Sequence, residues 1–139
     1  MKYVLDTNIV SALRKPAQNP AVIAWAASLP AEHAFITATT VAEIGRGIAA
    51  LDRHDPRQGR RLRAWFQSDM LGVFAERILP FDTDAALVFA TYRVPDHAPY
   101  DDAMIAAVAQ AHGMGVATRN TKHFEPLGVP LVNPYDTQP

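Results

Sequence analysis

The sequence predicts an α/β protein, a three-layer α/β/α sandwich built on a central parallel sheet of about five strands. Short apolar runs of strand type alternate with longer helical patterns, which is typical of a parallel sheet covered by helices on both faces. The chain has 139 residues and no internal repeat or long linker, so we expect one domain spanning residues 1–139. Apolar residues make up 49% of the chain, which is enough for a packed core.

The expected strands are short, and helical segments separate them. The strand runs cover residues 3–5, 33–38, 78–81, 115–118 and 130–132. Asn19-Pro20 opens a helix that extends through Trp25, and Asp55-Pro56 opens another. Another helical pattern begins at Thr39 or Thr40. Asp82 can cap a helix that extends through Tyr92, and Pro99 begins one that runs to His112.

Composition excludes several classes of site. The chain has no cysteine, which excludes a disulfide framework, a thiolate zinc site and a cysteine nucleophile. The net charge of −1 gives the whole molecule no general attraction for nucleic acid. The first residues lack the apolar run of a signal peptide, and no run reaches the roughly 18 apolar residues that span a membrane. We therefore expect a cytoplasmic protein without membrane association.

The first acidic candidate directly follows the first strand. Ligands of open parallel sheets bind beyond the carboxyl ends of the strands, and Asp6, Thr7 and Asn8 leave the sheet together at such an end. The alternative is that Asp6 or Thr7 only caps the following helix, and the motif alone does not decide between the two interpretations.

Glu43 is the second acidic candidate. It follows Thr40 by three residues, the spacing of a capping box, in which its carboxylate would bind the backbone N–H of Thr40. The functional interpretation is that Glu43 lies one turn into a helix that follows a strand, and therefore near the same edge of the sheet.

Asp101 and Asp102 open a helix after Pro99. The helix dipole stabilises acids in a first turn by roughly 0.3 to 1 kcal/mol each, which explains both structurally. Adjacent helical residues point about 100° apart, so only one of the pair need face a shared site. Asp102 is the better candidate because small alanine side chains surround it in the sequence.

Three carboxylates at one edge of a sheet favour a hard divalent cation. Two carboxylates about 4 Å apart repel each other by about 4 kcal/mol at an effective dielectric constant of 20. Mg²⁺ prefers oxygen ligands and is typically held by one or two carboxylates together with substrate phosphates. Thr118, Arg119 and Asn120 follow a later strand and reach the same edge, although Asn120 is interpreted first as a helix cap. His123 is interpreted as a surface or capping residue, since no second histidine lies at ligand spacing.

The residues resemble the PIN-domain nucleases, and among them the VapC-type toxins of bacterial toxin–antitoxin pairs. The resemblance covers almost the whole chain and rests on five segments in order. They are YVLDTN at 3–8, TVAEIGRG at 40–47, DAMIAAVA at 102–109, ATRNTKHF at 117–124 and VNP at 132–134. Many relatives carry a fourth acid near the segment that here holds Asn120 and His123, so this chain departs from the pattern there.

The resemblance implies an endoribonuclease that hydrolyses RNA with a metal-activated water and leaves 5′-phosphate and 3′-hydroxyl ends. Asp6, Glu43 and Asp102 match the family's acids, and Asp6 and Asp102 match its principal ligands for Mg²⁺, with Mn²⁺ as an alternative. Glu43 would orient or deprotonate the water, while Thr7, Asn8, Thr118 and Asn120 would support the site. A PIN module that binds RNA or a protein without turnover is the alternative, and the missing fourth acid favours it.

Partners follow from the resemblance and from one basic segment. The resemblance implies a second copy of the chain, as a homodimer, and a cognate antitoxin that covers the groove. Arg46, one turn from Glu43, is the preferred contact for an RNA phosphate. The other basic residues are Arg53, Arg57, Arg60, Arg61 and Arg63, and among them Arg57 and Arg60 are interpreted as a solvated face opposite the Leu62-Trp65-Phe66 stripe.

Overall fold

A computed structural model of the chain describes residues 1–136. Residues 137–139, the last of the predicted domain 1–139, lie outside the described part. Five strands form one sheet in the order β3-β2-β1-β4-β5, and all neighbouring pairs are parallel. The strands are β1 (Tyr3–Leu5), β2 (Ala34–Thr37), β3 (Ile78–Leu79), β4 (Gly115–Ala117) and β5 (Leu131–Val132). The predicted parallel sheet of about five strands is confirmed.

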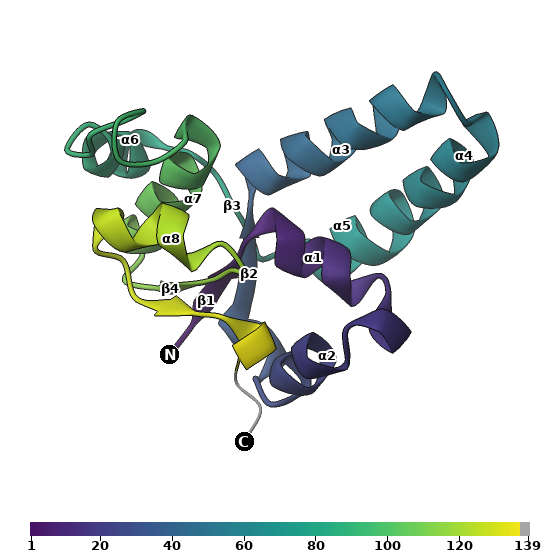
Figure 1. Cartoon of the computed structure of the whole chain (residues 1–139), viewed down its shortest axis with the longest axis horizontal. Helices are drawn as coiled ribbons and strands as arrows, with labels where there is room; N and C mark the ends of the chain where they lie inside the picture. The colour runs from purple at the N-terminus through teal and green to yellow at the C-terminus, as the bar shows by residue number, and fades with distance from the viewer. Residues whose placement is uncertain (137–139) are drawn as a thin grey trace.

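Helices cover both faces of this sheet, as the predicted three-layer sandwich requires (Figure 1). The helices are α1 (Thr7–Leu13), α2 (Pro20–Ala27), α3 (Ala38–Asp52), α4 (Pro56–Ala64), α5 (Leu71–Val73), α6 (Thr83–Phe89), α7 (Tyr100–Ala111) and α8 (Thr121–Phe124). A π-helical segment, Trp65–Met70, joins α4 to α5. The α3 and α4 helices form a long hairpin that projects from the body of the molecule beside α1 (Figure 1).

The core has two parts because successive side chains of a strand point to opposite faces. In β1, Val4 packs into a cluster with α7 and α8, while Leu5 packs into a cluster with α1 and α2. In β4, Val116 and Ala117 divide between the same two clusters. The register pairs Leu5 with Ala117, so β1 and β4 end side by side.

Several helix boundaries differ from the sequence prediction by one to three residues, and the start of α3 has a consequence for the site. The α3 helix begins at Ala38, because Thr37 at the end of β2 is its N-cap and accepts a hydrogen bond from the N–H of Thr40 at 3.2 Å. The α6 helix begins after Asp82, which caps it as predicted, but it ends at Phe89 and not at Tyr92. No helix within residues 1–136 has the length and apolar character needed to cross a membrane.

Candidate active site

Asp6 lies at the carboxyl end of β1, where three donors hold its carboxylate. The N–H of Thr7 donates to Oδ1 at 2.7 Å, the hydroxyl of Thr118 donates to Oδ2 at 2.7 Å, and the side-chain amide of Asn8 donates to Oδ2 at 3.3 Å. The residue is only 4% exposed. Asp6 therefore caps α1, as one of the two sequence interpretations expected, and at the same time faces the end of β4.

Asn8 and Thr118 connect the two strand ends that flank Asp6. The Oδ1 of Asn8 accepts a hydrogen bond from the N–H of Arg119 at 3.3 Å, and the Oγ1 of Thr118 accepts one from the N–H of Asn120 at 2.9 Å. Asn120 occupies the N-cap position of α8, as predicted, but its side chain makes no cap hydrogen bond there. Thr118 takes the backbone N–H at this turn instead.

The structure removes the capping interpretation of Glu43. Because the N-cap of α3 is Thr37, the N–H of Thr40 is already bound within the first turn, and a capping box with Glu43 does not form. The Oε1 of Glu43 is buried and has no hydrogen-bond partner within the described residues 1–136. A buried polar atom without a partner is costly, so this carboxylate points to a group outside the chain.

The electrostatic surroundings of Glu43 come from the other acids. Burial is the largest cause that raises the pKa of Glu43 to about 6, and the charges of Asp101 and Asp6 raise it further. Hydrogen bonding to Thr7 lowers the pKa and only partly offsets these effects. A carboxyl with a pKa near 6 exchanges protons readily at neutral pH, as a general base must.

Asp102 lies at the start of α7 and is partnered by His123, which the sequence interpretation did not place in the site. The Nδ1 of His123 is 2.8 Å from the Oδ2 of Asp102. Burial raises the pKa of Asp102, while His123 lowers it and Asp101 raises it. The position of His123 in the sequence indicates this contact, since the residue follows β4 by one turn of helix at the same edge of the sheet. His123 is not counted as a metal ligand because no second histidine lies at ligand spacing.

The three acids share one electrostatic neighbourhood. Burial raises the pKa of Asp6, hydrogen bonds from Thr118 and Thr7 lower it, and the charge of Asp102 raises it again. Within residues 1–136, however, no three acidic or histidine side chains stand at metal-binding separations. The charges of Asp6 and Asp102 nevertheless interact, since the charge of Asp102 contributes to the raised pKa of Asp6.

A groove leads away from Glu43 between α1 and the α3–α4 hairpin. It has a volume of about 270 Å³. Its lining consists of Thr7, Ser11, Arg14, Glu43, Ile44, Gly47, Ile48, Leu62 and Trp65. The groove therefore opens one of the three acids, Glu43, to solvent.

The basic residues of the sequence analysis differ in how they lie relative to the groove. Arg46 lies on α3 but is not among the residues that line the groove, so its role stays a prediction. The guanidinium of Arg119 lies 4.8 Å from the centre of the Tyr135 ring. The interpretation of Arg57 as opposite the Trp65 stripe is wrong, because residues 57, 61 and 65 follow one another at four-residue spacing and line a common cavity.

Comparison with known proteins places this chain in a family. The PIN domain model matches residues 3–127. The chain is 38% identical over 142 residues to the VapC ribonuclease Y4jK of Sinorhizobium fredii, a match that covers 96% of this chain and 97% of that protein. It is 36% identical to Toxin FitB of Neisseria gonorrhoeae over 95% of this chain and 97% of that protein.

A solved structure agrees with the sequence comparison. A chain in the structure of FitAB bound to an IR36 DNA fragment superposes with a TM-score of 0.87 and is 35% identical, over 99% of this chain and 98% of that one. Fold, sequence and matched length therefore agree, and the chain belongs to the PIN-domain family, among its VapC-type toxins.

Proposed function

We propose that this chain is the endoribonuclease toxin of a toxin–antitoxin pair, and that Asp6, Glu43 and Asp102 are its catalytic residues. The observation that carries the proposal is the Oε1 of Glu43, which is buried without a partner among residues 1–136, beside two further carboxyls of raised pKa. Folding leaves this atom unsatisfied, and a chemical role at an open groove explains why. The names of the similar proteins, a ribonuclease and a toxin, support the same activity.

A divalent ion fits the residues present. Asp6 and Asp102 would hold it, and the cation would offset their mutual repulsion, which contributes to the raised pKa of Asp6. When bound, Mg²⁺ or Mn²⁺ would supply positive charge that polarises the phosphate and stabilises the charge of the transition state. Asn8 and Thr118 keep the Asp6 carboxylate in place through the hydrogen bonds described above.

The remaining roles follow from position. Glu43 takes the proton of the water that attacks phosphorus, because its carboxylate opens into the groove and its pKa of about 6 leaves it ionised at neutral pH. The bond from phosphorus to the 3′ oxygen then breaks, and this oxygen takes up a proton from solvent, which yields a 5′-phosphate and a 3′-hydroxyl. Thr7 lines the groove together with Glu43 and lowers the pKa of its carboxyl. Asn120 and Arg46 keep their predicted supporting and phosphate-binding roles.

The partners proposed are RNA, a cognate antitoxin that covers the groove, and a second copy of the chain, all in the cytoplasm. The surface proposed for the RNA and the antitoxin is the exposed side of the groove between α1 and the α3–α4 hairpin.

The direct test incubates the purified chain with structured RNA in Mg²⁺, in Mn²⁺ and in EDTA, beside the variants Asp6→Asn and Asp102→Asn. We expect cleavage only with a divalent ion, and a loss of at least about a hundredfold in rate for each variant, the scale of an essential catalytic group. Asp84→Asn, an exposed acid on α6, is the matched control and should cleave like the wild type. If the wild type binds RNA without cutting it under all conditions, the non-catalytic PIN module is the correct function.

A further inference from the structure

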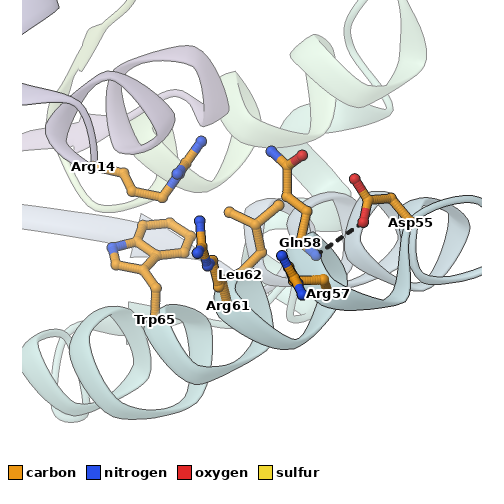
Figure 2. Close-up of a pocket in the computed structure, with 7 residues that line it drawn as sticks. All are labelled: Arg14, Asp55, Arg57, Gln58, Arg61, Leu62 and Trp65. Atoms are coloured by element: carbon orange, nitrogen blue, oxygen red, sulfur yellow. Dashed lines mark hydrogen bonds between the residues drawn. The ribbon is translucent and has the colours of Figure 1, made fainter.

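A second cavity continues the groove away from Glu43, and three arginines line it (Figure 2). Its volume is about 270 Å³. The lining consists of Arg14, Asp55, Arg57, Gln58, Arg61, Leu62 and Trp65. Arg14, Leu62 and Trp65 also line the groove that begins at Glu43, so the two cavities adjoin. We call the second cavity the arginine pocket.

The arginine pocket is assembled from segments far apart in the sequence. Arg14 follows the last turn of α1, whereas Arg57 and Arg61 project from α4 at four-residue spacing. In Figure 2, Arg14 reaches in from α1, and the Arg61 guanidinium lies beside the Trp65 ring. The fold therefore brings positive charge from two elements to the same side of the groove.

These guanidinium groups carry unneutralised charge. Among residues 1–136, the ion pairs are Arg63 with Asp52 and His123 with Asp102, and neither includes an arginine of the pocket. Asp55 is the one acid in the lining, and its Oδ1 accepts the N–H of Gln58 at 3.2 Å as the cap of α4. Three cations thus face one carboxylate in a molecule whose net charge is −1.

The pocket also offers flat and apolar surface. The Arg14 guanidinium lies 5.9 Å from the centre of the Trp65 ring, and Leu62 lies in the same lining. Arginine forks bind phosphate through two parallel hydrogen bonds, and aromatic rings stack on nucleic-acid bases with little regard to sequence. A phosphate with its attached nucleoside matches both surfaces at once.

We propose that the arginine pocket binds a nucleotide of the RNA strand at a distance from the scissile phosphate, with Arg14 and Arg61 on a phosphate and Trp65 and Leu62 against its nucleoside. This inference rests on the proposed ribonuclease function and adds a substrate-binding site outside the carboxylate centre. The three residues that line both cavities place the arginine pocket next to the groove that begins at Glu43. The net charge of the pocket favours RNA over an apolar peptide segment.

The test measures RNA affinity without turnover. A fluorescent single-stranded RNA is titrated with the wild type, Arg14→Gln and Arg61→Gln in EDTA at several salt concentrations. We expect each variant to weaken binding about tenfold, and to lower the slope of log affinity against log salt by about 0.7 for each phosphate that the protein no longer neutralises. Arg60→Gln is the matched control, since it removes the same charge from the same helix outside the pocket, and it should bind RNA like the wild type.

The combination of cleavage and binding results distinguishes failure of the pocket proposal from failure of the catalytic proposal. If the wild type does not cleave RNA but Arg14→Gln and Arg61→Gln still weaken binding, the pocket stands and the catalytic proposal fails. If the wild type cleaves RNA and both variants bind like Arg60→Gln, the pocket proposal is overturned alone. It is also overturned if the variants keep RNA affinity and lose affinity for the antitoxin. Arg61→Lys, which keeps the charge but not the fork, should give intermediate RNA affinity and guards against a folding defect.

Discussion

The hydroxyl of Thr118 donates a 2.7 Å hydrogen bond to the Oδ2 of Asp6, and this contact joins residues 112 positions apart in the sequence. It exists because β1 and β4 are parallel neighbours, with Leu5 opposite Ala117, so the next residue of each strand arrives at the same point. Both residues are buried. The hydrogen bond therefore fixes the orientation of the carboxylate that we assign as a metal ligand.

Thr118→Val tests this hydrogen bond with almost no change of side-chain volume. We expect a decrease of about 1–3 kcal/mol in the free energy of unfolding, because a buried carboxylate is left without one of its donors. RNA cleavage should fall about tenfold or more, since a misoriented ligand weakens metal binding. Urea denaturation and single-turnover cleavage measure the two effects. Thr118→Ser keeps the hydroxyl and should stay near the wild type in both, and equal behaviour of the two variants would contradict the role.

Glu43→Gln should stabilise the metal-free protein at neutral pH. The folded-state pKa of about 6 lies above the ordinary value of 4.5, so the folded chain binds more protons between these values and becomes less stable as pH rises through that window. The gain at neutral pH should be roughly 1 kcal/mol after allowance for solvent screening of this half-buried group, and it should vanish at pH values below the ordinary pKa.

Thermal unfolding in EDTA at neutral pH and at acidic pH measures this difference, and RNA cleavage by the same variant should be abolished. Glu32→Gln, at an exposed acid on another surface, is the control and should change stability equally little at both pH values. A Glu43→Gln variant that is less stable than the wild type at neutral pH would show that the carboxylate has a structural partner.

His123→Ala tests whether the histidine supports Asp102. Its Nδ1 contacts the Oδ2 of Asp102, whose side chain is 17% exposed. Partners that orient a coordinating carboxylate typically contribute ten- to a hundredfold in metal affinity, so we expect Mn²⁺ to bind about tenfold more weakly to the variant. Isothermal titration gives the affinity without any RNA. His112→Ala, at the exposed end of α7, should bind Mn²⁺ like the wild type, and tighter binding by His123→Ala would mean that the histidine competes with the ion.

Sequence patterns predict the sheet and the three acids because both depend on local signals. Apolar runs locate strands, and a parallel sheet brings the residues after its strands to one edge, so Asp6 and Thr118 can be placed at the same edge from the sequence alone. The start of α3 is harder to predict because Thr37, Thr39 and Thr40 are all good caps by residue type. The folded chain uses Thr37 in this role and leaves Oε1 of Glu43 without a partner in the described residues 1–136.

The residues that sequence reasoning missed depend on tertiary contacts that no local pattern reports. His123 meets Asp102 across 21 positions, and Arg14 meets Trp65 across a groove formed by separate helices. The predicted face of Arg57 is wrong because the apolar stripe was taken to begin at Leu62, whereas the spacing of residues 57, 61 and 65 places Arg57 on the side of Trp65.

Gly59→Ala should open the α3–α4 hairpin that carries the arginine pocket. A Cβ at Gly59 would lie 2.9 Å from the Cα of Asp52, so backbone atoms of the two helices would have to separate. Asp52 also holds Arg63 at 2.6 Å, and this ion pair would be disturbed. We expect a decrease of about 1–3 kcal/mol in the free energy of unfolding. Gly72→Ala, where an added Cβ meets nothing within 4 Å, is the control and should be neutral or slightly stabilising in urea denaturation.

Gly47→Leu separates stability from access to the site. Gly47 lies within α3 and lines the groove beside Glu43, and a Cβ there would meet nothing within 4 Å. Replacing a helical glycine removes a cost of roughly 0.5–1 kcal/mol, so the variant should unfold at a urea concentration no lower than that of the wild type. The leucine side chain fills the groove next to the proposed base, and RNA cleavage should fall sharply. Gly72→Leu adds the same side chain outside the groove and should leave cleavage intact, whereas equal rates for Gly47→Leu and the wild type would show that the RNA strand takes another path to Glu43.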